Sequence, residues 1–207
     1  MKNSRLQLMI FLTVAFAYSC GGEDKVPETT TKPAVVIKKD SSVHPLQAPI
    51  INIIDTIALK YLVVYMKDSA ATSEGISEKL SKIYSKSIPE MLAKANIATN
   101  GPPIAWYKNT SAPFFFEAGI PVEKKPAKLP KGFFVKNIGG DSAVIAHFYG
   151  PYSITNMGYD ALADWAKENK KRKNGIPYEI YVSEPLDEKG KAIDPYRLRT
   201  DIIFPHK

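Results

Sequence analysis

The chain has 207 residues, of which 44% are hydrophobic and 24% are charged, a composition typical of one globular domain of about 150 residues with appendages. Its formal net charge is +7, which could suit a nucleic acid or an anionic membrane surface. The sequence nevertheless contains no helix-turn-helix pattern, zinc-finger spacing or aromatic RNA-binding motif. We therefore do not expect a nucleic-acid partner.

The N-terminus has the pattern of an export signal. A short positive segment precedes an apolar run over residues 6–17, which is too short for a comfortable membrane span. The only cysteine, Cys20, follows in "FAYSCGG", which resembles a bacterial lipobox although Ala17 and Tyr18 depart from its preferred residues. We predict that residues 1–19 are a lipoprotein signal peptide and that acylated Cys20 anchors the chain in a bilayer. An ordinary secretory signal with a coincidental cysteine is the alternative.

The composition changes after the cysteine. Residues 20–49 are rich in Thr, Lys, Asp, Ser and Pro, which is typical of a flexible tether. The acidic pair Glu23–Asp24 and the Gly21 beside the cysteine are compatible with sorting to the outer membrane. We expect an outer-membrane lipoprotein of the cell envelope, facing the periplasm or the cell surface.

The first half of the remaining chain alternates between strand and helix patterns. A run rich in β-branched and aromatic residues predicts a strand over residues 57–66. Helical spacing of apolar residues follows over 72–97, with an interruption at Pro89. Two further strands are predicted over 103–109 and 113–122.

The second half has the same order of elements. A strand is predicted over 141–150 and a helix over 153–173, ending at Asn174–Gly175 as its C-terminal cap. Strands over 177–183 and 198–205 close the chain. Both halves therefore have the order strand, helix, strand, strand.

The two halves also share sequence. "NGPPIAWY" at residues 100–107 aligns with "NGIPYEIY" at 174–181, with identical Asn, Gly, Pro and Tyr. Further on, residues 117–121 match 201–205, and the second copy carries an additional polar loop over 186–196. We interpret these matches as an internal duplication.

Four segments resemble a known family: "AVIAHFYGPYSITNMGYDALADWAKENK", "NGIPYEIYVSEP", "LRTDIIFPH" and "FFFEAGIPV". On these, residues 50–207 resemble the GyrI-like small-molecule-binding domain, also known as the AraC-type effector-binding domain. The resemblance implies an α+β fold of duplicated strand–helix–strand–strand modules, about 50–123 and 131–207, with pseudo-twofold symmetry and a cleft between them. We expect this chain to lack the DNA-binding domain of regulator members and to carry the predicted lipoprotein leader in its place.

Glu179 is the principal candidate for a ligand-binding residue. The duplicated position in the first module is Ala105, so the scaffold does not require an acid there. The resemblance implies that Glu179 lies in the cleft and recognises a small cationic, often aromatic, ligand. Further expected ligand-binding residues are Tyr181, Tyr107, Tyr149, Tyr152, His147 and Phe116. Alternatively, Glu179 is an exposed strand residue paired with a lysine, and the aromatic residues belong to the core.

No catalytic motif is present, so we expect ligand binding without catalysis, and no cofactor. His147 and His206 lack further ligands at metal-site spacing, so no metal is expected either. Two alternatives stay open: a GyrI-like hydrolase in which Glu179 activates water beside Tyr107 or Tyr149, and a protein-interaction module whose partner the sequence does not identify. Glu117 and Asp201, which match across the modules, are expected to be structural acids.

Overall fold

The computed structural model describes residues 47–207. The predicted signal peptide, Cys20 and nearly all of the predicted tether lie outside the described residues. Within residues 47–207, none of the helices is both long enough and apolar enough to cross a membrane.

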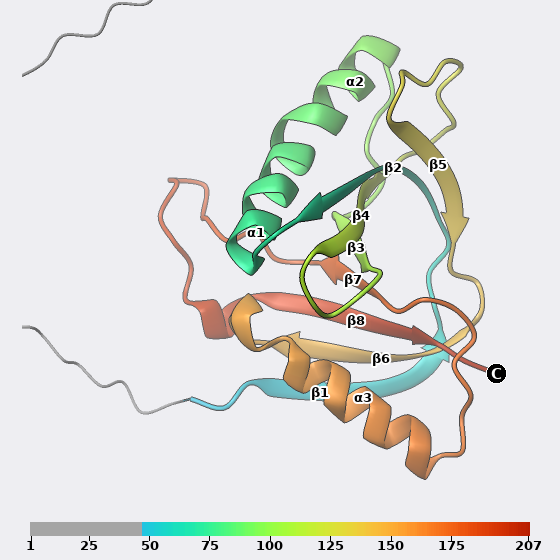
Figure 1. Ribbon diagram of the computed structural model, residues 1–207, viewed down its shortest axis with the longest axis vertical. Helices are drawn as coiled ribbons and strands as arrows, with labels where there is room; N and C mark the ends of the chain where they lie inside the picture. The colour runs from blue at the N-terminus through green and yellow to red at the C-terminus, as the bar shows by residue number, and fades with distance from the viewer. Residues whose placement is uncertain (1–46) are drawn as a thin grey trace, which may run out of the picture. The chain divides into compact units, whose positions relative to one another are not determined.

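One antiparallel sheet of eight strands forms the centre of the fold, with the order β1-β6-β8-β7-β3-β4-β2-β5 (Figure 1). The strands are β1 Ile50–Ile57, β2 Tyr61–Ala70, β3 Ile104–Tyr107, β4 Phe114–Pro121, β5 Phe133–Ile138, β6 Ser142–Tyr149, β7 Tyr178–Tyr181 and β8 Arg199–Pro205. Every strand predicted from the sequence is present. The strand predicted over 57–66 is displaced toward the C-terminus. Strand β1 ends at Ile57, and β2 begins only at Tyr61.

The first helical unit contains α1 (Ser73–Lys82), a π-helical turn (Ile83–Ser87) and α2 (Ile88–Ala95). The Thr72 hydroxyl caps its start by accepting a hydrogen bond from the Gly75 N–H at 3.2 Å. The predicted interruption at Pro89 is confirmed as this π turn, in which the Ile88 N–H bonds to the Ile83 carbonyl. Proline has no N–H and its ring crowds the preceding turn, so the helix is wider there and then resumes.

The second helical unit is shorter than predicted. A 3₁₀ turn (Tyr152–Ile154) leads into α3 (Asn156–Glu168), and Lys170 then adopts the left-handed conformation with φ 54°. The predicted end at Asn174–Gly175 is wrong, because the chain already runs along the sheet there. The Asn174 N–H bonds to the Pro205 carbonyl at 2.8 Å. A second 3₁₀ segment, Pro195–Arg197, precedes β8.

Two edge strands, β1 and β5, were not predicted, and they cross between the halves of the sheet. β1 precedes β2 in the chain but pairs with β6, whereas β5 precedes β6 but pairs with β2. The two linkers meet where the Ala58 N–H bonds to the Asp141 carbonyl at 3.0 Å. A Cβ at Gly139 would lie 1.8 Å from the Leu59 carbonyl oxygen, and φ there is +74°, so this crossing requires glycine. The result is a mixed fold with a large antiparallel sheet and two helical units.

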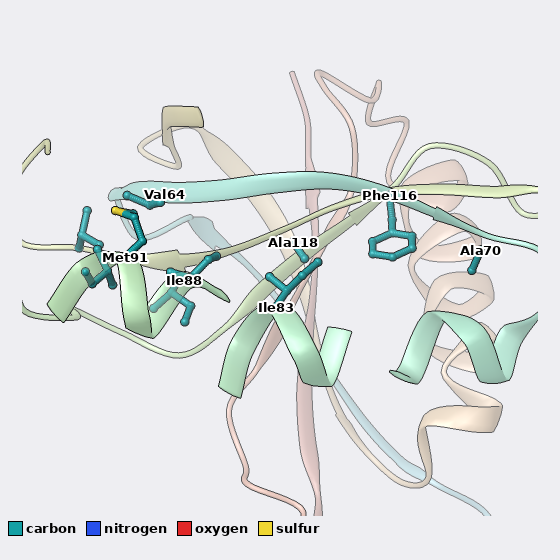
Figure 2. Close-up of a cluster of buried hydrophobic side chains, with 10 residues drawn as sticks. Val64, Ala70, Ile83, Ile88, Met91, Phe116 and Ala118 are labelled. Atoms are coloured by element: carbon teal, nitrogen blue, oxygen red, sulfur yellow. The ribbon is translucent and has the colours of Figure 1, made fainter. Parts of the chain in front are cut away.

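Both helical units cover the same face of the sheet, which we call the helix face. Ala105, Ala118, Glu179, Ile202 and Ala146 form one cross-strand row on this face. Ala118 belongs to a core cluster with Ile83, Ile88 and Met91 of the first unit, and Figure 2 shows these side chains directed at the strands. Ala146 and Ile202 pack with Leu162 of α3.

The opposite face carries a third cluster, formed by Val63, Trp106, Ala143, Tyr178 and Ile203 with their neighbours. These residues come from strands as far apart in the sheet order as β2 and β6. The twist of the sheet therefore brings its two halves together on the side without helices.

Candidate ligand site

Glu179 lies at the centre of the helix face. Its strand β7 pairs with β3 and β8, and Glu179 is opposite Ala105 on one side and Ile202 on the other. Because α3 packs over β6 and β8 and the first helical unit packs over β2 and β4, Glu179 lies at the junction of the two packed halves. Only 6% of Glu179 is exposed, so the alternative of a solvated strand acid is wrong.

Five tyrosines surround this carboxylate, and we call them the tyrosine shell: Tyr84, Tyr107, Tyr152, Tyr159 and Tyr181. The Tyr159 hydroxyl donates to Glu179 Oε1 at 3.0 Å. The Tyr107 and Tyr181 hydroxyls bond to each other at 2.7 Å across the β3–β7 pair. The Tyr84 and Tyr152 rings meet the Tyr181 ring edge-on, with centroids 6.0 and 5.6 Å away.

Burial dominates the electrostatics of the site. It raises the pKa of Glu179 above its ordinary value, although the hydroxyls of Tyr181 and Tyr159 act in the opposite direction. Burial also raises the pKa of each shell tyrosine, and the negative charge of Glu179 adds to that increase. The hydroxyls therefore stay protonated and serve as hydrogen-bond donors. Among the described residues, Glu179 forms no ion pair with a lysine, arginine or histidine.

Glu117 and Asp201, by contrast, lie on the opposite face and are paired with cations. Glu117 accepts a hydrogen bond from the Lys136 ammonium at 2.7 Å, with the Lys108 nitrogen at 3.2 Å. Asp201 accepts two from the Arg199 guanidinium, at 2.7 and 2.8 Å. These ion pairs agree with the expectation of structural acids.

The structure brings together four of the predicted ligand-binding residues: Glu179, Tyr181, Tyr107 and Tyr152. Phe116 is fully buried in the core, with its ring centroid 6.4 Å from that of Tyr107. It therefore packs against a shell tyrosine and belongs to the core. Tyr152 is 44% exposed and marks the solvent side of the site.

His147 and Tyr149 were predicted as further wall residues, but the structure places both on the opposite face. His147 pairs with Asp201 in the β6–β8 ladder, and its Nδ1 lies 2.7 Å from Asp201 Oδ1. Asp201 in turn is opposite Ile180, whose side chain leaves β7 on the side away from Glu179. This register carries His147 and Tyr149 away from the carboxylate, so neither can line the site around it.

Two shell members, Tyr84 and Tyr159, were missed from the sequence. Tyr84 lies four residues after Leu80 and four before Ile88, and Tyr159 lies three before Leu162, so both follow the apolar spacing of their helices. Helical spacing could have placed them on the buried faces, but it could not show that these faces meet at Glu179.

Other features of residues 47–207 lie apart from this site. A groove of about 660 Å³ is formed by α2, β2, β5 and the loop before β5, with Met66, Met91 and Phe133 among its lining residues. No group of three or more His, Cys, Asp or Glu side chains in the described part of the chain could hold a metal ion.

Comparisons with known proteins agree with this fold. Residues 58–207 match the family described as the GyrI-like small molecule binding domain. No match was found among curated protein sequences.

Solved structures with the same fold include the C-terminal domain of EcmrR, with a TM-score of 0.64 and 16% identity, covering 76% of this chain and 98% of that domain. The EcmrR chain in its complex with DNA gives a TM-score of 0.62 and 18% identity over 76% of this chain, and the match spans 57% of that longer chain. A hydrolase from Listeria innocua gives a TM-score of 0.52 and 10% identity, covering 75% of this chain and 91% of that protein. At these identities the likeness concerns the fold alone.

Proposed function

Because the chain belongs to the GyrI-like small molecule binding domain family, we propose that it binds a small organic cation, preferably an aromatic one, at the junction of its two halves. Glu179 is the charge partner of this ligand, and the tyrosine shell forms the walls. One observation carries the proposal: Glu179 is a buried carboxylate that has tyrosine hydroxyls as neighbours but no cationic partner among the described residues.

The energetics favour a cation over a neutral compound. Withdrawing a carboxylate from water costs several kcal/mol unless a positive charge or several donors compensate for it. The Tyr159 hydroxyl supplies one such donor, and a bound cation would supply the missing charge. Each well-placed tyrosine face would add about 0.5–2 kcal/mol of cation–π attraction. Tyr152, the exposed member of the shell, lies where a ligand would enter.

We further propose that the two halves arose by duplication and are related by a pseudo-twofold axis. The order β2, helix, β3, β4 recurs as β6, helix, β7, β8, and the sheet order has the same elements at equivalent places on either side of the β3–β7 pair. Ala105 and Glu179 are direct neighbours across that pair. The binding site would then result from an acid that one copy carries and the other lacks.

A thermal-shift titration with cationic aromatic compounds, compared with neutral compounds of the same shape, tests this proposal. A ligand present at about one hundred times its dissociation constant stabilises the fold by about 2.7 kcal/mol. We expect Glu179→Gln to weaken cation binding at least about tenfold while leaving the neutral compounds unaffected. Asp160→Asn, which removes an exposed carboxylate of α3, serves as the matched control. Equal cation affinity in the wild type and Glu179→Gln would refute the proposed role of the carboxylate.

A hydrolytic reaction is the alternative use of this site, because the Tyr159 hydroxyl lies within proton-transfer distance of Glu179. Tyr149 lies on the opposite face and cannot act as the proton donor. The raised pKa of each shell tyrosine makes it a weak acid, which favours binding over catalysis. Chromatography of compounds recovered after long incubation separates the two functions: a binding protein returns its ligand unaltered, and a hydrolase does not.

We also propose that the binding domain is anchored to the outer membrane through acylated Cys20, with residues 21–49 as its tether. The support is the sequence alone: an apolar run followed by a single cysteine, and then a polar segment rich in Thr, Lys and Pro. Fractionation and mass spectrometry of the exported protein, compared with Cys20→Ser, would detect the loss of both the acyl chains and the membrane association.

A further inference from the structure

Among residues 47–207, strand β1 leaves one backbone edge open at the end of the sheet. Within this part of the chain it pairs with β6 only, and it is the first strand in the sheet order (Figure 1). Three of its isoleucines are well exposed: Ile50 at 57%, Ile54 at 42% and Ile57 at 66%. An edge of this kind presents unpaired N–H and C=O groups to any strand that fits it.

β1 also lacks the features that usually protect an edge strand. Its sequence, "IINIIDTI", has no proline and no lysine over eight residues. Its single charge, Asp55, is held on the helix face by His206 Nε2 at 2.7 Å and by Lys171 Nζ at 3.3 Å. The other edge strand, β5, is shorter and contains Lys136. The open backbone of β1 is therefore the less protected of the two edges.

The residues of β1 are arranged almost symmetrically about Ile54. Counting outward from it, Ile53 meets Asp55, Asn52 meets Thr56, and Ile51 meets Ile57. Two of these three pairs match polar with polar or apolar with apolar. In an antiparallel pair of two β1 strands, most residues would therefore face a residue of similar polarity. This pattern favours pairing of β1 with β1 of a second copy.

We propose that β1 pairs with β1 of a second copy of this chain, antiparallel and centred on Ile54, so that the two sheets continue into one. A twofold axis perpendicular to the sheet generates such a pair, because it reverses the strand and keeps the helix faces of both copies on the same side. This axis requires that paired residues share a face, as all the pairs around Ile54 do.

The arrangement buries what the single chain leaves exposed. The two Ile54 side chains meet on the opposite face, and Ile57 meets Ile51 of the second copy on the helix face. Asp55 stands beside Ile53 of the second copy, so the two carboxylates are not directly opposed. The open N–H and C=O groups of both edges find partners, which is the main gain in strand addition.

Cysteine cross-linking tests the register directly. The experiment uses the chain 21–207, which keeps every described residue and contains no native cysteine. Residues directly opposite in antiparallel strands have Cα atoms about 4.5–5.5 Å apart, within the range that a disulfide spans. We expect Ile54→Cys to form a covalent dimer under mild oxidation. Phe115→Cys, at a 51% exposed site on β4 in the other half of the sheet, should not.

Sedimentation across a concentration series gives a second, independent readout. We expect the wild type to dimerise, and Ile54→Lys to weaken the dimer at least about tenfold because two ammonium groups would meet across the axis. Mixing Ile54→Lys with Ile54→Glu should restore dimers, since residue 54 faces residue 54. Phe115→Lys should dimerise like the wild type.

A wild-type chain that stays monomeric at every concentration would overturn the proposal, and so would dimers that persist in Ile54→Lys. Cross-linking at residue 115 as fast as at residue 54 would mean random collision and would overturn it as well. Neither readout requires a ligand, so the outcome is independent of the function proposed for Glu179.

Discussion

The two glutamates buried in this sheet, Glu117 and Glu179, have similar exposure and opposite electrostatics. They are exposed by 7% and 6%, respectively. Burial raises the pKa of both, but at Glu117 the hydrogen bonds and charges of Lys136 and Lys108 outweigh it and leave the pKa below its ordinary value. At Glu179 burial prevails and the pKa is raised.

This difference separates a structural acid from a candidate functional one. The charge of Glu117 is already neutralised, and the Lys136 ammonium that pairs with it also lies 3.2 Å from the centre of the Trp106 ring. The charge of Glu179 has no such partner among residues 47–207. Burial alone does not distinguish the two residues. Their partners distinguish them: Glu117 is paired with lysines, whereas Glu179 has no cationic partner among residues 47–207. This lack of a cationic partner identifies Glu179 as the candidate functional acid.

The largest expected effect on stability is that of Glu117→Gln. It leaves the Lys136 ammonium half-buried without a carboxylate, and we expect a loss of about 2 kcal/mol in the free energy of unfolding at neutral pH. The value is below the roughly 3–5 kcal/mol typical of fully buried pairs because Lys136 retains some access to water. Urea unfolding of both chains gives the difference, and a cost below that of an ordinary surface mutation would show that Glu117 is not a structural acid.

Glu179→Gln should have the opposite sign and a smaller size. The raised pKa means that the folded wild type is destabilised as pH rises from 4.5 through the folded-state pKa, so the variant should be the more stable of the two at neutral pH. Below pH 4.5 both side chains are neutral and the difference should vanish. Glu117 has a lowered pKa, so the wild type should be more stable than Glu117→Gln above pH 4.5. It should lose this additional stability as pH falls through the folded-state pKa of Glu117.

Unfolding measured from acidic to neutral pH in the three chains checks these slopes. Differences from the wild type that converge at low pH and diverge with opposite signs at neutral pH are expected. Parallel curves would contradict the distinction between the two acids.

The smallest effect is expected at the rim of the Glu117 cluster. Lys67 lies 4.0 Å from Glu117, but its side chain is largely exposed, so Lys67→Met should change the free energy of unfolding by less than about 0.5 kcal/mol. Lys136→Met, the matched variant at 2.7 Å, leaves Glu117 with more distant partners and should cost clearly more. Similar costs for the two lysines would mean that proximity to Glu117 does not determine its stabilisation.

The sequence alone determined much of the local structure and the identity of the central acid. Period-two and helical spacing located both helical units and six of the eight strands. When one face of an element is buried, apolar residues recur along the sequence with the period of that element. Comparing the halves singled out Glu179 against Ala105. The two strands that were missed, β1 and β5, lie at the edges, where only one side of a strand is paired and the pattern is weaker.

Only the tertiary structure decided which residues share the site with Glu179. His147 and Tyr149 have the right chemistry, but the β6–β8 register turns them to the opposite face. Tyr84 and Tyr159 come from two helices far apart in the chain, and the packing of both on one face brings them to the same carboxylate. Spacing along a chain reports which side of its own element a residue occupies. Which elements meet depends on strand order and register, which arise from contacts between residues far apart in the sequence.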